Sequence, residues 1–210
     1  MNKKISALLL AGAMMLSLAA CGSKEAAPAP APAPSAPSTS TEAAGEVAGL
    51  TAPIAEAPAL VTSGGQSADY QMIATVMGKV GMDYTVNNLC TSADLGDAKT
   101  LIVVVGGSSK GLGAAGIDAD GELARLNEVI DGAKSAGLTV IAMHTGGEAR
   151  RGELSDKFIS PIFEKADYAI VVTSGDEDGL MSGICASKGI PMDGIASISE
   201  VATVLPAAFK

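Results

Sequence analysis

The sequence predicts an α/β domain built on a mainly parallel sheet, and three observations support this prediction. Short apolar runs, of which Leu101–Val105 is the most apolar, lack the polar alternation of half-exposed strands and suit strands buried on both faces. They alternate with segments of helical periodicity. Glycine-rich stretches follow four of them, as in loops that lead from a strand to a helix. Together these features indicate successive βαβ units.

The first predicted strand is Ala59–Ser63, and a helix is expected over Ser67–Val80. Apolar residues recur at helical spacing within this helix, and Gly81 ends it. Asp83–Asn88 predicts a second strand whose polar composition is typical of a sheet edge.

Thr100–Val105 predicts the third strand. The glycine-rich segment after it is expected to remain a loop until a helix over Gly121–Ala136, which ends at Gly137. Leu138–His144 predicts the fourth strand.

The last part of the chain predicts a fifth strand, Asp167–Ser174, and three helices. The helices are expected at Glu153–Ala166, interrupted at Pro161, at Asp178–Lys188, and from the capping-box pattern Ser197–Glu200 to about Ala208.

Right-handed crossovers leave few topologies for such a chain. A polar second strand favours the order 2-1-3-4-5. The predicted fold is therefore a three-layer flavodoxin-like or Rossmann-like domain with a five-stranded, mainly parallel sheet.

Composition excludes one class of partner. The chain has 210 residues, a formal net charge of −9 and only 3% aromatic residues. Nucleic-acid binding requires a basic surface, so no nucleic-acid partner is expected.

The N-terminus has the pattern of an export signal. Lys3 and Lys4 precede a short apolar segment, Ile5–Leu18, which is too short for a permanent membrane helix. The segment Leu18–Cys21 resembles the lipobox of bacterial lipoproteins. The resemblance implies cleavage before Cys21, lipidation of that cysteine, and an extracytoplasmic protein anchored to the bacterial cell membrane.

Alternating alanine and proline follow the lipobox and predict a disordered, semi-rigid tether. The expected organisation is a signal peptide over residues 1–20, a lipidated cysteine with its linker over 21–51, and one α/β domain over 52–210.

Polar loop residues follow the four apolar strands, and parallel strands bring such loops to one edge of a sheet. Glycine lets the main chain approach a ligand, and helix N-termini favour anions. We therefore expect a binding site for a small anionic ligand at this edge. The candidate ligand-binding residues are Ser63, Gly64, Gly65, Gln66, Gly107, Ser108, Ser109, Lys110, His144, Thr145, Gly146, Arg150 and Ser174.

Known cofactor motifs do not fit this chain well. The glycines of Gly111–Gly116 lie too far beyond the strand for a dinucleotide fingerprint, and no Gly-Lys-Ser/Thr of a P-loop follows. The acidic clusters Asp118–Glu122 and Asp176–Asp178 suit helix N-termini without a metal. No cofactor and no metal are therefore expected.

An alternative interpretation is a serine-dependent hydrolase. Gly107–Gly111 satisfies G-x-S-x-G directly after a strand, which would make Ser109, or in a variant of this idea Ser63, the nucleophile. His144 is the one histidine in the chain and would be the base. Several loop residues are expected between Ser109 and the next helix, which departs from the nucleophile elbow. Cys90 and Cys185 are expected to be buried free thiols.

The segments Ala59–Asp69, Thr100–Asp118, Leu138–Gly152 and Tyr168–Gly179 together resemble a bacterial domain family of unknown function that occurs in exported proteins and lipoproteins. The resemblance spans about residues 55–208 and implies no activity. The sequence thus predicts a lipid-anchored domain that binds a small anionic solute and serves a membrane transporter. The alternatives are the hydrolase and a non-catalytic protein–protein assembly module.

Overall fold

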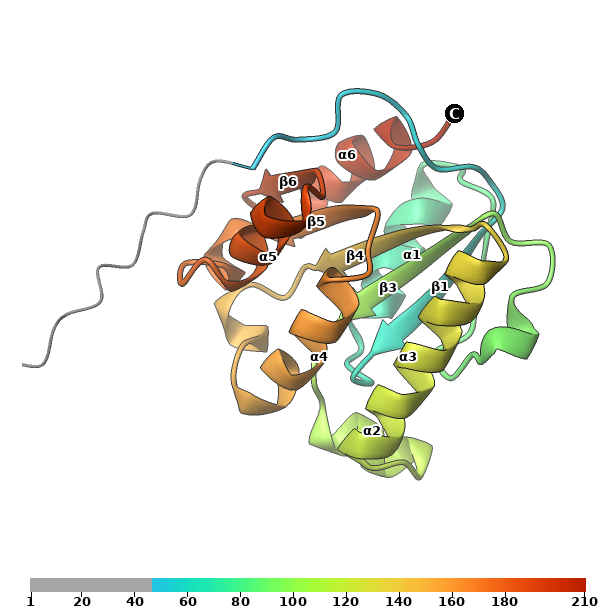
Figure 1. The fold of residues 1–210 in the computed structure, drawn as a ribbon, viewed down its shortest axis with the longest axis vertical. Coiled ribbons are helices and arrows are strands. Elements are labelled where there is room, and N and C mark those ends of the chain that lie inside the picture. Colours follow the sequence, from blue (N-terminus) through green and yellow to red (C-terminus); the bar gives the residue numbers. More distant parts are fainter. Residues whose placement is uncertain (1–46) are drawn as a thin grey trace, which may run out of the picture. The chain divides into compact units, whose positions relative to one another are not determined.

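The computed structural model describes residues 47–210, and Figure 1 shows the fold. The predicted signal peptide, Cys21 and most of the predicted linker lie outside these residues. Six parallel strands form one sheet in the order β2-β1-β3-β4-β5-β6. The strands are β1 (Ala59–Gly64), β2 (Tyr84–Val86), β3 (Thr100–Val105), β4 (Thr139–His144), β5 (Tyr168–Val172) and β6 (Met192–Ile195). The α-helices are α1 (Asp69–Lys79), α2 (Ser109–Ala115), α3 (Ala119–Ser135), α4 (Glu153–Phe163), α5 (Leu180–Lys188) and α6 (Val201–Ala207).

The predicted α/β class and the order of the first five strands are confirmed, but the sheet has six strands rather than five. The added strand, β6, pairs with β5 from Met192 to Ile195 at the far edge of the sheet. The strand contains Asp193 and Gly194 and comes directly after Pro191. Aspartate, glycine and proline are all depleted in strands. Because an edge strand needs one partner only, tertiary pairing overrides this local preference.

A second correction concerns the segment after β3, which is helical and not a long loop. α2 begins at Ser109, and the Ser108 hydroxyl accepts a hydrogen bond from Gly111 N at 3.0 Å as its N-cap. The helix ends at Gly116, whose φ is 68°. Two glycines within seven residues lower the helix propensity, so the sequence pattern resembles a loop.

The ends of two other helices also differ from the predictions. Pro161 lies inside α4, which continues through it to Phe163 and ends there. The predicted capping box does not form, because Ser197 Oγ lies 2.6 Å from Ser199 Oγ and a 3-10 turn precedes α6.

Helices cover both faces of the sheet and give the predicted three layers. α3, α4 and α5 lie on one face, and α1 and α6 lie on the other (Figure 1). Neighbouring residues of β3 alternate between the two layers, since Val103 packs in the first core and Val104 in the second. Cys90 and Cys185 are both buried and free, and burial raises the pKa of Cys185 to about 11.

The segment before β1 runs along the edge where the strands begin. Met192 N donates to Ala48 O at 3.1 Å, and Leu50 N donates to Asp193 Oδ2 at 3.2 Å. Glu56 N then donates to Thr100 Oγ1 at 3.1 Å. These contacts begin before the boundary predicted at residue 52. The segment that leads toward the predicted tether therefore lies opposite the edge where the strands end.

No helix between Val47 and Lys210 is both long enough and apolar enough to cross a membrane.

Candidate functional site

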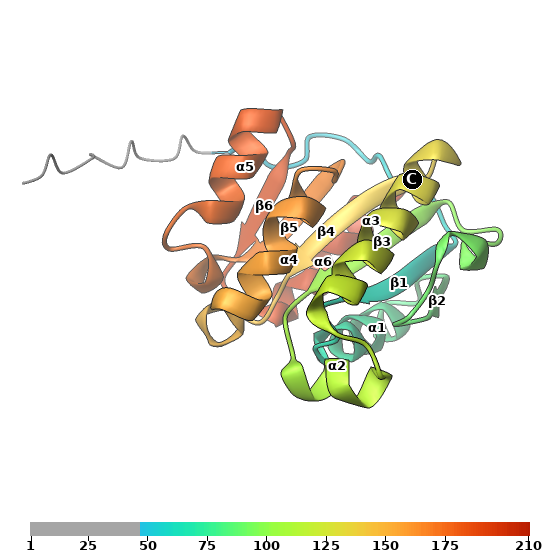
Figure 2. The same cartoon turned by 60° about the horizontal axis from the view of Figure 1, so that its bottom comes forward.

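The carboxyl ends of β1 and β3 form the centre of the candidate site. β1 lies between β2 and β3, and the chain leaves β1 and β3 toward opposite faces of the sheet. This arrangement is a topological switch point, where open α/β sheets bind ligands in the crevice beyond the strand ends. Figure 2 brings this edge forward, with α1 and α2 beside it.

The loops after β1 and β3 are joined through their main chains. Gly65 has a φ of 104° and Gln66 a φ of 60°, a region that residues other than glycine rarely adopt. Ser108 N donates to Gly65 O at 2.9 Å, and Gln66 forms an isolated antiparallel bridge with Gly107. The two loops are therefore held as one unit.

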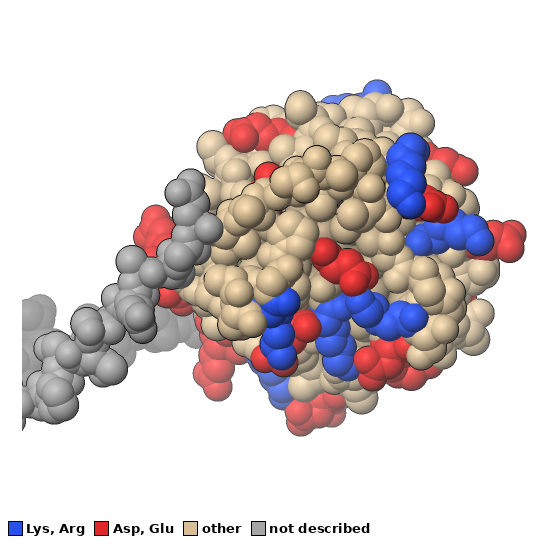
Figure 3. Space-filling model, turned by 45° about the horizontal axis from the view of Figure 1, so that its top comes forward, with Lys and Arg blue, Asp and Glu red and all other residues tan. Residues whose placement is uncertain are grey.

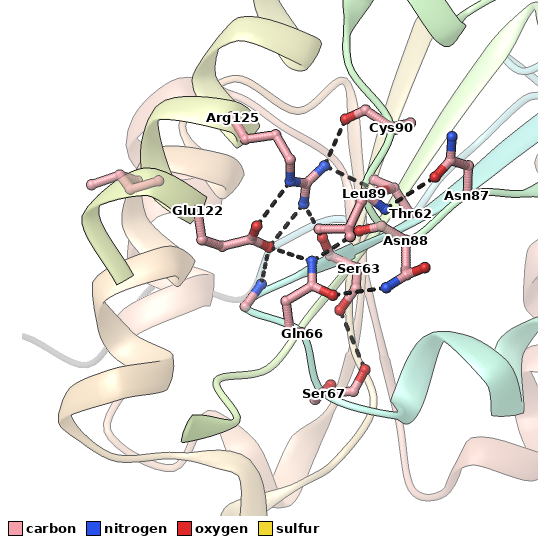
Figure 4. Close-up of polar contacts among 12 residues, drawn as sticks. Thr62, Ser63, Gln66, Ser67, Asn87, Asn88, Leu89, Cys90, Glu122 and Arg125 are labelled. Carbon is pink, nitrogen blue, oxygen red and sulfur yellow. Dashed lines mark hydrogen bonds and ion pairs between the residues drawn. The ribbon is translucent and has the colours of Figure 1, made fainter. Parts of the chain in front are cut away.

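A buried carboxylate stabilises the strained loop (Figure 4). Glu122 of α3 is fully buried, and its Oε1 accepts hydrogen bonds from Gly65 N at 2.9 Å and Gln66 Nε2 at 3.0 Å. The Arg125 guanidinium compensates its charge, with Nε donating to Oε2 at 2.8 Å. This ion pair lets a charged group remain inside the fold.

The same arginine ties α3 to β1 and to the segment after β2. Arg125 Nη2 donates to Ser63 O at 2.7 Å, and Nη1 donates to Cys90 O at 2.8 Å. Nη1 also lies 3.4 Å from Thr62 Oγ1. The Arg125 guanidinium therefore links α3, β1 and the segment after β2, which meet at the site (Figure 4).

Gln66 and Asn88 exchange hydrogen bonds across the edge of the sheet. Asn88 Nδ2 donates to Gln66 Oε1 at 2.9 Å, and Gln66 Nε2 donates to Asn88 O at 2.9 Å. The side-chain amide of Gln66 is thereby fixed between the segment after β2 and Glu122.

A pocket of about 440 Å³ opens between α1, α2 and the segment after β2. Its size lies in the range typical of small-molecule sites. It is lined by Gln66, Ser67, Ala68, Tyr70, Gln71, Asn88, Leu89, Ser108, Lys110, Gly111, Ala114 and Ala115.

Close packing fixes the distance between α2 and the loop after β1. A Cβ atom added at Gly111 would overlap the Gln66 carbonyl oxygen. Gly113 in the same helix faces open space, because nothing lies within 4 Å of an added Cβ there. Gly111 therefore permits the close approach that forms one wall of the pocket.

A second polar cluster lies beside the pocket. It joins the start of α1 to Arg150 in the loop after β4. Asp69 is buried at the start of α1 and accepts a hydrogen bond from Ser67 Oγ at 3.0 Å. Arg150 Nε lies 3.2 Å from Asp69 Oδ2. Arg150 is thus neutralised by an internal partner.

His144 and Thr145 are buried at the end of β4. His144 Nε2 lies 3.2 Å from Arg150 O, whereas His144 Nδ1 and Thr145 Oγ1 have no hydrogen-bond partner among the described residues. Gly175 packs against the ring, since an added Cβ would lie 2.7 Å from Nδ1. Burial lowers the pKa of His144 below its ordinary value, so the ring is neutral near pH 7.

One aspartate from each of the two acidic clusters noted in the sequence caps a helix. Asp118 Oδ1 accepts a hydrogen bond from Gly121 N at 2.7 Å, and Asp176 accepts from Met181 N and Ser182 N. Within residues 47–210 there is no group of three or more His, Cys, Asp or Glu residues able to hold a metal ion.

Lys110 is the charged residue of the pocket. Four lysines form no ion pair with another described residue, namely Lys79, Lys99, Lys110 and Lys188, and Lys110 alone among them lines the pocket. On the face in Figure 3, by contrast, basic and acidic side chains are interspersed. An unpaired lysine next to a pocket lined by no described acidic residue favours a negatively charged ligand.

The predicted site residues fall into three groups. Gln66, Ser108 and Lys110 line the pocket, and Ser109 and Ser174 are exposed outside its lining. The others belong to the surrounding framework and are Ser63, Gly64, Gly65, Gly107, His144, Thr145, Gly146 and Arg150.

Sequence reasoning missed the contribution of the segment after β2. Asn88 and Leu89 line the pocket, although only the four apolar strands were expected to supply site residues. The sequence signal was Asn87-Asn88 at the end of a predicted edge strand, since asparagine is common in turns next to such sites.

The geometry bears on the hydrolase alternative in two ways. Ser109 is the first residue of α2 directly after the turn from β3, which matches the strand–turn–helix context of a nucleophile elbow better than expected. His144 is fully buried and Ser109 is exposed, and no hydrogen bond joins them within the described part of the chain. This conformation does not provide Ser109 with a general base.

Comparison with known proteins gives a family and no activity. A family model described as "Domain of unknown function (DUF6305)" matches residues 56–209. Among solved structures, the psychrotrophic esterase EstA from Pseudoalteromonas sp. is similar with a TM-score of 0.30 and 12% identity, covering 65% of this chain and 76% of that chain. TesA has a TM-score of 0.30 and 14% identity, with coverages of 64% and 77%. Similarities this low carry no argument about function, and no curated protein matches the chain.

Proposed function

Since the chain belongs to DUF6305, a domain family of unknown function, we propose from the geometry of its site that it binds a small anionic solute. The observation that carries this proposal is the pocket of about 440 Å³ at the topological switch point, with Lys110 as its charged lining residue. A pocket at this position is the default ligand site of an open α/β sheet.

Hydrogen bonds and close packing within the protein hold the walls of this pocket in place. Gln66 is fixed by Glu122 and Asn88, and the approach of α2 is fixed at Gly111. A rigid site loses little conformational entropy when it binds a small molecule, which supports a binding role.

The proposal includes the membrane anchor expected from the sequence. Cys21 would carry the lipid, and the domain would serve a transporter in the same membrane. Metabolic labelling with radioactive palmitate tests the anchor. The wild-type chain should incorporate label and Cys21→Ala should not. Labelling of both to the same extent would contradict lipidation at Cys21.

A thermal-shift screen of the full chain, purified in detergent, tests the binding function. The panel consists of carboxylates, phosphates, sugars, nucleotides and divalent metals. A ligand present at about 100 times its dissociation constant stabilises the folded state by about 2.7 kcal/mol. The midpoint should then rise by roughly 2–4 °C for a domain of this size.

The matched control for this screen is a second unpaired lysine. Lys99 is exposed at the start of β3, at the opposite edge of the sheet from Lys110. An anionic hit should disappear in Lys110→Ala and persist in Lys99→Ala. The absence of any hit, or equal loss in both variants, would contradict solute binding at this pocket.

One observation favours the assembly module as a second candidate. The large apolar side chains that are exposed among residues 47–210 lie on α1 and its C-cap, on β2 and on the segment after β2, and they are Met72, Val80, Val86 and Leu89. Exposed apolar side chains on neighbouring elements are typical of protein-binding surfaces. Size-exclusion chromatography with light scattering tests self-association, which Val86→Asp should abolish.

The hydrolase alternative has its own test. If Ser109 and His144 catalyse hydrolysis, then activity toward chromogenic esters should be lost in Ser109→Ala and in His144→Ala. Equal background hydrolysis by all three proteins would exclude this alternative.

A further inference from the structure

We propose that the ligand of the pocket between α1 and α2 is an amphipathic monoanion, a carboxylate attached to a small apolar or aromatic body. This inference rests on the proposed function and adds the chemical class of the solute. Three features of the pocket carry it, namely its free hydrogen-bond donors, its apolar lining residues and its single cation.

Two hydrogen-bond donors of the pocket lining, Lys110 and Ser108, remain available to a ligand. Ser67 Oγ is committed to Asp69, and the Gln66 amide is committed on both atoms to Asn88 and Glu122. Lys110 has no ion-pair partner among the described residues, and Ser108 Oγ accepts from Gly111 N, so its own hydrogen is available. A free ammonium group and a free hydroxyl hydrogen match an anionic group.

The lining of the pocket also includes apolar side chains. They are Ala68 before α1, Leu89 after β2, and Ala114 and Ala115 of α2, and Leu89 remains 37% exposed. These side chains offer apolar contacts to a flat or short aliphatic body bound in the pocket. Covering such a surface contributes about 25 cal/mol per Å² of apolar area removed from water.

The charge of the pocket limits the charge of the ligand. Lys110 supplies one positive charge, and no arginine lies among the described residues that line the pocket. A phosphate monoester carries close to two charges and is bound best by arginine forks or several cations, which this pocket lacks. A carboxylate matches one ammonium group and one hydroxyl. A sugar would leave the apolar lining residues and the lysine unmatched.

The test uses four compounds that share the phenyl group and one that lacks it. They are phenylacetate, phenylethanol, phenethylamine and phenyl phosphate, with acetate as the compound without the apolar body. Affinities for the full chain in detergent are measured by isothermal titration calorimetry and ligand-observed NMR. Phenylacetate should bind about tenfold more tightly than either phenylethanol or acetate. Phenylethanol lacks the carboxylate that forms the charge-assisted hydrogen bond, and acetate lacks the phenyl group that makes the apolar contact. Phenethylamine should not bind.

Two pairs of variants locate the effect. Lys110→Met should weaken phenylacetate about tenfold and leave phenylethanol unchanged, whereas Lys99→Met should alter neither. Leu89→Ala should weaken phenylacetate without affecting acetate. Met72→Ala, which removes an exposed apolar side chain outside the pocket lining, should have no effect. All four positions are exposed, so these variants should fold.

The outcomes separate this inference from the proposed function. Tighter binding of phenyl phosphate than of phenylacetate, with loss in Lys110→Met, would overturn the ligand class and leave anion binding intact. Phenylacetate binding that is as tight in Lys110→Met as in the wild type would overturn the site assignment. Absence of binding by phenylacetate and phenyl phosphate alike, together with no anionic hit in the thermal screen, would overturn both.

Discussion

The Arg125 guanidinium forms a two-point ion pair with Glu122 inside the fold. Nε donates to Oε2 and Nη2 donates to Oε1, each at 2.8 Å. Both residues belong to α3, three positions apart, and they support the main chain of the loop after β1 through Gly65 and Ser63. The strained backbone at the pocket is therefore maintained by a charge pair on another element.

Removing one partner of this pair should destabilise the whole domain. Arg125→Met leaves the Glu122 carboxylate buried without its counter-ion, and a loss of about 3–5 kcal/mol in the free energy of unfolding is expected. Urea denaturation followed by circular dichroism measures it. Lys157→Met, which breaks the exposed ion pair with Asp120, is the control and should cost less than about 1 kcal/mol. Equal, small effects would show that Glu122 and Arg125 do not support the fold.

Two glycines of α2 should respond in opposite directions to the same substitution. Gly111→Ala forces a methyl group onto the Gln66 carbonyl oxygen and should cost about 1–3 kcal/mol. Gly113→Ala meets no atom within 4 Å and should stabilise the protein by about 0.5–1 kcal/mol through higher helix propensity. Thermal and urea unfolding compare both variants with the wild type. Stabilisation by both substitutions would mean that α2 does not pack closely on the loop after β1.

The stability of the domain should fall as the pH decreases below neutrality. Burial lowers the pKa of His144 in the folded state, while the unfolded chain has a histidine pKa of about 6.5. The unfolded state therefore binds a proton that the folded state does not. The stability that the neutral ring contributes is present above pH of about 6.5 and is lost as the pH falls toward the lowered folded value.

The expected slope from this group is at most about 1.4 kcal/mol per pH unit. Urea denaturation at pH 7.5 and at pH 5.5 measures it, and His144→Gln should flatten the difference because the chain has one histidine. A slope that is unchanged in His144→Gln would assign the pH dependence to other groups.

The sequence predicted correctly those elements whose pattern of apolar and polar residues matches their position in the sheet. Thr100–Val105 was predicted with its observed limits, because a fully buried central strand must be apolar on both faces. The edge position of β2 followed from its polar residues, and β2 is exposed at two of its three positions. The pocket between α1 and α2 lies at the edge where the glycine-rich ends of β1 and β3 meet, and the binding function of this edge stays a prediction.

The remaining features depend on contacts between distant segments. β6 contains Asp193 and Gly194, and its pairing with β5 decides its conformation. The buried hydrogen bond from Gly65 N to Glu122 joins residues that are 57 positions apart in the sequence. Because local spacing does not reveal such a contact, the acidic residues near the start of α3 suggested only helix capping. Arg150 was expected to face the ligand, but its pairing with Asp69 could not be read from spacing.

Backbone NMR with the full chain in detergent tests the central claim, anion binding at the carboxyl ends of β1 and β3, most directly. On titration with phenylacetate, shifts in amide resonances should concentrate in Ser67–Gln71, Asn88–Leu89 and Ser108–Ala115. In Lys110→Met the same shifts should require about ten times more phenylacetate. Shifts confined to the opposite edge, around Lys99 and Lys134, or no saturable shifts with any anion, would contradict the account.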